Sequence, residues 1–328
     1  MILAAGSAVA AGGGVESLVA TVRNALQARN SDAEVALAVH ASWLTERLDD
    51  AVIEQLQSEG AGPQAVEELE RLRDLSSGLA APAPPLELFD APPAPPAEER
   101  AAALEKARLF ATHYTANLPN FLCTENVRRY ANSKEGWKSE EPVTWEVGFS
   151  DQREQRRLIG FGGEPTNRQS VRGTSSSGEF GGVLNLVFQP ESLTRFDWER
   201  WANLNGRMTY VFSFRIDRKH AEFLLDAGAL IHHRAYVAMR GLVYVDRETL
   251  QVRRILYEAD GVPKGFPIAA MHTLVDYDYA DIGGEKFLLP RRSSLRIVAK
   301  DASRHRNVTE FAKYRKFTSE AKIDFGKQ

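Results

Sequence analysis

One stretch of this sequence constrains the fold more than any other, because residues 194–258 have the pattern of consecutive strands joined by short turns. Within Gly206–Ile216 large apolar side chains recur at every second position, the period that is typical of a half-buried strand. These large residues are Tyr210, Phe212, Phe214 and Ile216. A hairpin follows, in which Asp246 starts a charged turn between Gly241–Val245 and Gln251–Tyr257. Such a meander has to cover its apolar face or leave it open to a ligand.

The flanking sequence predicts further strands and a short apolar helix. The strand Phe121–Tyr130 places Phe121, Cys123, Glu125, Val127 and Arg129 on one face. The segment Glu179–Phe188 is apolar without alternation, which favours a short helix that plugs the sheet. The other predicted strands are Val143–Phe149, Arg156–Phe161, Ile268–Asp281, Glu285–Ile297 and Asn307–Phe317. We expect about eleven strands with mostly hairpin connections, hence an antiparallel sheet.

The N-terminal part predicts helices and a spacer. Apolar residues in 15–75 recur at steps of three and four, which indicates a small bundle of about four helices. Asp32 is a candidate cap for the second helix, and Pro63 suits the first turn of the fourth. Seven of the chain's 15 prolines fall in residues 76–97, so this segment should be an extended linker. Its apolar island Leu86–Phe89 is expected to dock onto one of the domains.

The resulting domain prediction has four parts. Residues 1–14 are a flexible start or the remnant of a secretory signal peptide, because their apolar run ends in an Ala-x-Ala pattern but lacks a basic beginning. Residues 15–75 are an acidic all-α bundle, residues 76–97 a linker, and residues 98–328 an antiparallel domain. The predicted class is α+β, with a curved sheet that forms an unclosed half-barrel and covers helices.

Charge is distributed unevenly along the chain. Residues 1–100 contain 6 Lys and Arg against 16 Asp and Glu, whereas residues 101–328 contain 35 against 28, which gives the net charge of −3. The two parts are either separately solvated or attracted to each other, or the basic part faces an anionic surface. In the C-terminal region Arg292, Arg296 and Lys300 share strand parity and are the candidate face for an anionic partner. Nucleic acid is not expected, because no aromatic residues are interleaved with the basic ones.

Signatures of catalysis and of metal binding are weak. No glycine-rich loop is followed by the Lys and Ser/Thr of a phosphate-binding loop, and no nucleophile elbow occurs. Adjacent His232 and His233 would point to opposite faces of a strand, and Cys123 is the single cysteine. The carboxylates of Asp276, Asp278 and Asp281 suit either a solvated face or a calcium ion. We therefore predict no enzyme activity, no cofactor and no metal site, and no segment is apolar enough to span a membrane.

The strand pattern resembles a known family. The phrases Leu204–Phe212 and Gly241–Ile255 are similar to segments of the lipoprotein-carrier superfamily, which includes LolA, LolB and the N-terminal domain of RseB-like envelope sensors. The resemblance covers about residues 104–325. The segment Tyr114–Cys123 is similar to a Tyr-x-x-x-Leu-Pro-Asn-Phe-x-Cys segment in uncharacterised secreted bacterial proteins. The resemblance implies a cavity that holds acyl chains or a lipidated peptide, outside the cytoplasm, although the bundle and linker depart from the family pattern.

Together these observations predict a non-enzymatic envelope protein, periplasmic or secreted, that binds an apolar ligand such as a lipid in a half-barrel cavity. The predicted ligand-binding residues are Trp145, Phe161, Trp198, Tyr210, Phe212, Phe214 and Ile216. The alternative prediction is a protein-interaction or sensor module with a filled core, which acts through the helical bundle and the basic hairpin.

Overall fold

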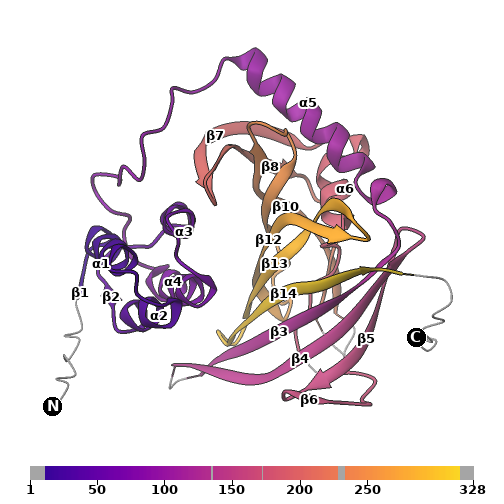
Figure 1. Ribbon diagram of the computed structural model, residues 1–328, viewed down its shortest axis with the longest axis horizontal. Coiled ribbons are helices and arrows are strands. Elements are labelled where there is room, and N and C mark those ends of the chain that lie inside the picture. The colour runs from indigo at the N-terminus through magenta and orange to yellow at the C-terminus, as the bar shows by residue number, and fades with distance from the viewer. Residues whose placement is uncertain (1–11, 134–135, 172, 228–232, 318–328) are drawn as a thin grey trace. The chain divides into compact units, whose positions relative to one another are not determined.

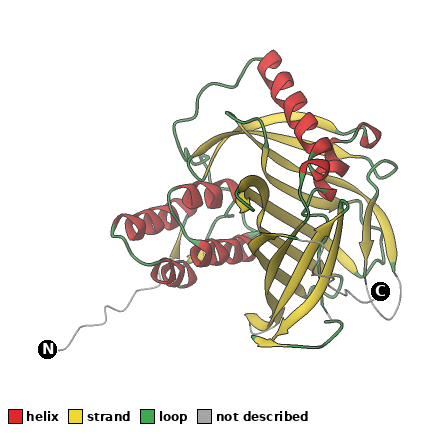
Figure 2. Ribbon diagram, turned by 45° about the vertical axis from the view of Figure 1, so that its right-hand side comes forward, coloured by secondary structure: helices red, strands yellow, loops and turns green. Residues whose placement is uncertain are grey.

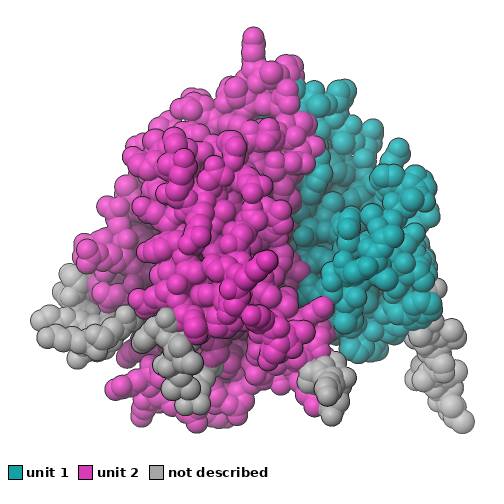
Figure 3. Space-filling view, turned by 180° about the vertical axis from the view of Figure 1, so that it is seen from behind, with its two compact units in different colours: residues 1–95, 200–210 teal, residues 96–199, 211–328 magenta. Residues whose placement is uncertain are grey.

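The computed structural model describes residues 12–133, 136–171, 173–227 and 233–317. The chain forms two compact units (Figure 3). Unit 1 consists of residues 1–95 and 200–210, and unit 2 consists of residues 96–199 and 211–328. Each unit has a buried apolar cluster of its own.

Unit 1 is built on four helices, as the periodicity of residues 15–75 predicts. Val22, Leu56 and Leu69 are completely buried in its core. Two short strands pair in parallel beside the helices. The elements are β1 (Gly12–Gly13), α1 (Val15–Gln27), α2 (Asp32–His40), β2 (Trp43–Leu44), α3 (Asp50–Ser58) and α4 (Pro63–Ser76).

The helix caps of unit 1 differ in one respect from the sequence prediction. Ser31, rather than Asp32, caps α2, in a reciprocal capping box with Glu34. The Asp32 carboxylate instead accepts hydrogen bonds from the backbone N–H groups of Gln64 and Ala65, at 2.8 and 3.0 Å. These donors lie in the first turn of α4, where a carboxylate is favoured by the helix dipole. Asp32 therefore joins the start of α2 to the start of α4.

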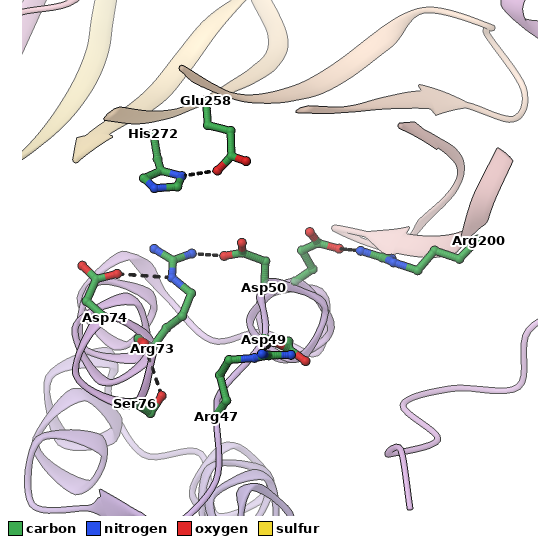
Figure 4. A network of polar contacts seen from close by, with 10 residues as sticks. Arg47, Asp49, Asp50, Arg73, Asp74, Ser76, Arg200, Glu258 and His272 are labelled. Carbon is green, nitrogen blue, oxygen red and sulfur yellow. Dashed lines mark hydrogen bonds and ion pairs between the residues drawn. The ribbon is translucent and has the colours of Figure 1, made fainter. Parts of the chain in front are cut away.

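The proline-rich segment between α4 and α5 contains no helix or strand. Leu86 and Leu88 pack against the core of the helical bundle, which confirms that this apolar island docks. Ion pairs lie near the start of α3 and the end of α4 (Figure 4). Arg73 of α4 pairs with Asp50 of α3 and, at 3.5 Å, with Asp74 of its own helix. Arg47 pairs with Asp49, just before α3.

Residues 200–210, the tip of a strand hairpin, belong to unit 1 through specific polar contacts. The Arg200 guanidinium lies 2.9 Å from the buried carboxylate of Glu54 in α3 (Figure 4). The Ser58 hydroxyl donates to Asn203 at 2.7 Å and accepts from the backbone N–H of Gly206 at 3.0 Å. The Trp201 indole donates to the carbonyl of Pro93 at 3.0 Å.

The main sheet has 12 strands and is open rather than closed into a barrel, which confirms the predicted half-barrel of an α+β protein (Figure 1). The strand order is β6-β5-β4-β3-β14-β13-β12-β11-β10-β8-β7, and β9 pairs with β10. The strands are β3 (Phe121–Ser133), β4 (Gly136–Ser150), β5 (Arg153–Phe161), β6 (Glu164–Pro165), β7 (Arg195–Leu204), β8 (Arg207–Ile216), β9 (Phe223–Asp226), β10 (Arg234–Asp246), β11 (Val252–Asp260), β12 (Ile268–Ile282), β13 (Glu285–Ala299) and β14 (Arg304–Lys316).

Two helices of unit 2 pack on the sheet (Figures 1 and 2). They are α5 (Ala97–His113), which ends before the short 3-10 turn Thr115–Asn117, and α6 (Gly182–Phe188), which precedes the turn Pro190–Ser192. Helix α5 contacts α6, β10 and β11. Because α6 buries Val183, Leu184, Val187 and Phe188, the predicted plug helix is confirmed. The face of the sheet that carries α6 is called the inner face below.

The hairpin between β10 and β11 forms as predicted. The Asp246 carboxylate accepts hydrogen bonds from the N–H groups of Glu248 and Thr249, both at 2.9 Å. Within β10, Gly241 is required by close packing, because a Cβ at this position would fall on the carbonyl oxygen of Leu256 and against the ring of Phe214.

Candidate functional site

Strand alternation places a mixed polar and apolar surface on the inner face near β3. Glu125, Val127 and Arg129 of β3 share this face. In the strand register Trp145 of β4 lies opposite Glu125, and Thr309 of β14 lies opposite Val127. These residues line a cavity of about 300 Å³, here called the Trp145 cavity. Among the described residues, its remaining wall comes from Val143, Arg156, Asn307 and residues 169–171 and 173–176.

A second cavity of about 530 Å³ lies farther along the inner face and is called the Met271 cavity. Met271 of β12 and Ile297 of β13 are register partners in its wall. Tyr257 of β11 is buried beside them, and the ring of Phe223 meets it edge-on with centroids 5.8 Å apart. Leu224, Leu225 and Ile268 add further apolar surface. Its wall also contains the polar residues Glu154, Arg156, Asp226 and Ser175–Ser177, so polar and apolar groups contribute about equally. The cavity has the size of a small-ligand pocket.

The two cavities adjoin each other, because Arg156, Ser175 and Ser176 line both. The intervening chain, residues 173–180, is called the inner loop and is held by three donors. Arg156 donates to the carbonyl of Ser176 at 2.8 Å, and the Asn307 amide donates to the carbonyl of Thr174 at 2.6 Å. The Tyr277 hydroxyl donates to the carbonyl of Glu179 at 3.0 Å. The inner loop therefore borders both cavities and is held in place by these hydrogen bonds.

Beside the inner loop, Arg156 contacts three carboxylates. Its guanidinium lies 3.3 Å from Glu179, 3.4 Å from Glu125 and 3.7 Å from Glu154. Glu179 is 1% exposed and Glu125 is 5% exposed, so solvent does not screen these charges effectively. One half-buried cation therefore faces two buried carboxylates and the half-buried carboxylate of Glu154, and we call these four residues the Arg156 cluster.

Two carboxyl groups of the Arg156 cluster have raised pKa values. Burial raises the pKa of Glu125 to about 7, although the positive charge of Arg156 opposes this shift. Burial, followed by the neighbouring charge of Glu179, raises the pKa of Glu154 to about 7. Backbone N–H groups of Phe180 and Gly178 donate to Glu154 and partly offset its shift. The carboxyl groups of Glu125 and Glu154 therefore each titrate near neutral pH.

Glu125 has one oxygen that lacks a hydrogen bond. Its Oε2 atom is buried, and no hydrogen-bond donor satisfies it among the described residues. This atom forms an ion pair with the Arg156 Nε atom, at 3.4 Å. Because Glu125 lines the Trp145 cavity, this acceptor belongs to the wall of an open space rather than to a filled core.

The predicted ligand-binding residues fall into two groups. Trp145 and Phe161 are half-buried near the Trp145 cavity, where Trp145 is part of the wall and the Arg168 guanidinium lies 4.3 Å from the centre of the Phe161 ring. The other group lies on β7 and β8. Its members are Trp198, which is half-buried, and Tyr210, Phe212, Phe214 and Ile216, which are each at most 3% exposed.

The β7–β8 group packs against aromatic neighbours. The Trp198 ring meets Phe212 edge-on at 5.8 Å between centroids. Phe196 links Phe214 to Phe188 of α6, with a stacked Phe188–Phe196 pair at 5.2 Å. These side chains share the predicted face, and their contribution to ligand binding stays a prediction.

The predicted anionic-partner face lies on the side of β13 opposite the inner face. Arg292 is 8% exposed and stands in register between Asp276 of β12 and Glu310 of β14. Arg296 is half-buried, and Lys300 is exposed in the turn after β13. The role of these three residues also stays a prediction.

The other polar residues singled out in the sequence have local partners. Asp276 forms a bidentate ion pair with Arg254, whose Nε and Nη2 atoms donate to its two carboxylate oxygens at 2.5 and 3.0 Å. The Asp281 carboxylate accepts a hydrogen bond from the backbone N–H of Gly284 in a turn. Cys123 is buried in an apolar cluster, and burial raises the pKa of its thiol. His232 lies outside the described residues. In the part of the chain that is described, no group of three or more His, Cys, Asp or Glu side chains is placed to hold a metal ion.

Sequence reasoning did not identify the Arg156 cluster. Along β5, Glu154 and Arg156 alternate with the equally polar Gln155 and Arg157, so the sequence of this strand did not mark one face as the inner one. Glu179 gave no signal either, since it belongs to a loop whose placement depends on the fold.

Comparison with known proteins adds a likeness of fold. No protein-family model and no curated protein matches the sequence. Among solved structures, a LolA superfamily protein from Nitrosomonas europaea has 12% identity and a TM-score of 0.37, over 69% of this chain and 97% of that one. A DUF1329 family protein from Desulfovibrio piger has 12% identity and a TM-score of 0.35, over 69% and 96%.

A putative outer membrane lipoprotein-sorting protein domain from Vibrio parahaemolyticus has 12% identity and a TM-score of 0.37, over 68% of this chain and 97% of that one.

Proposed function

We propose that this protein is a non-enzymatic binder of an apolar ligand, such as a lipid, an acyl chain or a lipidated peptide, and that it acts in the periplasm or after secretion. The observation that carries the proposal is the Met271 cavity, a partly apolar space of about 530 Å³ on the inner face of an open sheet. A closed core would fill such a space with side chains, because protein interiors are close-packed.

The energetics favour a chain-like apolar ligand. Burial of one methylene group contributes about 0.8 kcal/mol, so a chain of ten or more carbons offsets the cost of association. The walls formed by Met271, Ile297 and Phe223 present side chains that suit such a chain. Methionine adapts to irregular apolar shapes, which fits a ligand without a fixed conformation.

The chemistry of the inner face supports binding rather than catalysis. The one thiol, Cys123, is buried in the apolar cluster and its pKa is raised, which is the opposite of an activated nucleophile. The Glu179 carboxylate is engaged by Arg156 and by the Ser176 hydroxyl. No helix of the described residues is long and apolar enough to cross a membrane.

The test is a comparison of lipid content and probe binding in three proteins. Wild-type protein is purified and extracted with organic solvent, the extract is analysed by mass spectrometry, and binding of a fluorescent fatty acid is then measured. A double variant, Met271→Trp with Ile297→Phe, narrows the Met271 cavity, and Leu109→Trp on the exposed side of α5 is the matched control. Circular dichroism establishes that each variant is folded.

We expect the double variant to bind the probe at least tenfold more weakly, while Leu109→Trp binds as the wild type does. A wild type that neither retains any lipid nor binds the probe would refute the proposed function. Equal affinity of the folded double variant and the wild type would refute the Met271 cavity as the site.

A further inference from the structure

The Trp145 cavity differs from the Met271 cavity in its chemistry. Its wall includes a carboxylate oxygen, Oε2 of Glu125, that is buried and accepts no hydrogen bond from the described residues. A buried acceptor left without a donor destabilises the unliganded protein, because the desolvation of that oxygen is not offset by a hydrogen bond. A ligand that carries a hydrogen-bond donor into this cavity would recover that free energy, whereas a purely apolar ligand would not.

The charges that face Glu125 select the kind of donor. From β5, Arg156 is the nearest cation, but it is also contacted by Glu154 and Glu179. Arg129, farther along β3, pairs with Glu140 of β4 at 3.4 Å. The inner loop and β14 contribute neutral groups to the wall, namely serine, threonine and asparagine. The wall itself contains one carboxylate, Glu125, and two arginines, but Glu154 and Glu179 contact Arg156, and Glu140 contacts Arg129. With these partners counted, four carboxylates face two arginines, so the local charge favours a cation over an anion.

An aromatic ring borders the same space. Trp145 stands directly opposite Glu125 in the β3–β4 register and lines the Trp145 cavity. Indole rings attract cations, and tryptophan does so more strongly than other aromatic residues. A carboxylate and an indole on adjacent strands are a suitable pair for an ammonium group, because one supplies charge and the other a polarisable wall.

We propose that the Trp145 cavity binds the protonated amine head of an amphiphile whose apolar chain occupies the adjoining Met271 cavity. The ammonium group donates to Oε2 of Glu125 and lies beside Trp145. This assignment rests on the proposed function, because it assumes that the Met271 cavity holds the chain, and it specifies the ligand class as cationic rather than neutral or acidic.

The raised pKa of Glu125 gives an independent readout. Because burial raises the pKa of Glu125 to about 7, a large fraction of this carboxyl group is protonated at neutral pH. An ammonium ligand stabilises the ionised form, so its binding releases a proton from the protein. Calorimetry in two buffers with different ionisation enthalpies measures that release directly.

The experiment compares dodecylamine, dodecanol and dodecanoate, which share one chain length and differ in the head group. Their affinities are measured at pH 7 for the full-length wild type and for Glu125→Gln. The control is Glu146→Gln, which makes the same change on the opposite face of β4, where Glu146 pairs with Arg157 and Arg315. We expect the wild type to bind the amine at least tenfold more tightly than the alcohol, and the carboxylate most weakly.

In Glu125→Gln the preference for the amine should fall at least tenfold, while the affinity for dodecanol stays unchanged. Glu146→Gln should retain the wild-type preference. Equal binding of the amine and the alcohol, or a preference that survives Glu125→Gln, would overturn this inference and leave the proposed function standing. If none of the three amphiphiles binds, the proposed function itself fails.

Discussion

The buried carboxyl group of Glu125 makes the stability of unit 2 depend on pH in a direction opposite to that of most carboxylates. Its pKa in the folded protein is about 7, against an ordinary value of 4.5. Between these two values the folded protein holds a proton that the unfolded chain has released. Stability therefore falls as pH rises from 4.5 to 7 and levels off above that.

The difference in pKa sets the size of the effect. A shift of one pKa unit corresponds to about 1.4 kcal/mol, so ionised Glu125 costs the folded state about 3 kcal/mol at pH 8 relative to pH 4. Glutamine has nearly the shape of the protonated acid. Glu125→Gln should therefore have little effect at pH 5 and stabilise the protein at pH 8 by about 2 kcal/mol, after allowance for the lost ion pair with Arg156.

Thermal unfolding by calorimetry between pH 5 and 8 measures this difference. For a unit of this size 2 kcal/mol raises the melting temperature by about 4–8 °C. Glu105→Gln removes one charge from an exposed position of α5 and serves as the control. The reasoning is refuted if Glu125→Gln melts no higher than the wild type at pH 8, or if its melting temperature falls with rising pH as steeply as that of the wild type.

Two further predictions concern the framework of each unit. Gly241→Ala should destabilise unit 2 by more than about 2 kcal/mol, because the added methyl group meets the Leu256 carbonyl; calorimetry should show this loss, with Gly78→Ala, which meets nothing within 4 Å, unchanged. Asp32→Ala should destabilise unit 1 by about 1–2 kcal/mol, because the first turn of α4 loses two hydrogen bonds, and an unaltered denaturant midpoint by helical circular dichroism would contradict this.

The strands and their faces were predictable because alternation is a local property. Along β3, Phe121, Cys123 and Glu125 were assigned to one face, and the structure buries all three there. On β8 the same rule holds from Phe212 to Ile216, where Ser213 and Arg215 are the more exposed residues. Val211 is also buried, because this strand is covered on both faces at that point.

The candidate site was not predictable, because its parts meet only through long-range register. Arg156 reaches Glu125 since β3 and β5 both flank β4, an arrangement that no short window of sequence contains. Glu179 joins them because the inner loop folds back over the sheet. The cap of α2 shows the same limit on a smaller scale, since the role of Asp32 was fixed by the distant start of α4.

The assignment of residues 200–210 to unit 1 has a consequence for how the chain can be divided. The polypeptide passes between the units three times, at residues 95–96, 199–200 and 210–211. A single cut in the proline-rich linker therefore separates unit 1 into two pieces and leaves its hairpin tip, with Trp201 and Tyr210, attached to the other fragment. Unit 1 thus consists of two chain segments that are distant in sequence. A protein that lacks residues 1–95 would keep the hairpin tip but lose the contacts that Arg200, Trp201 and Asn203 make in unit 1.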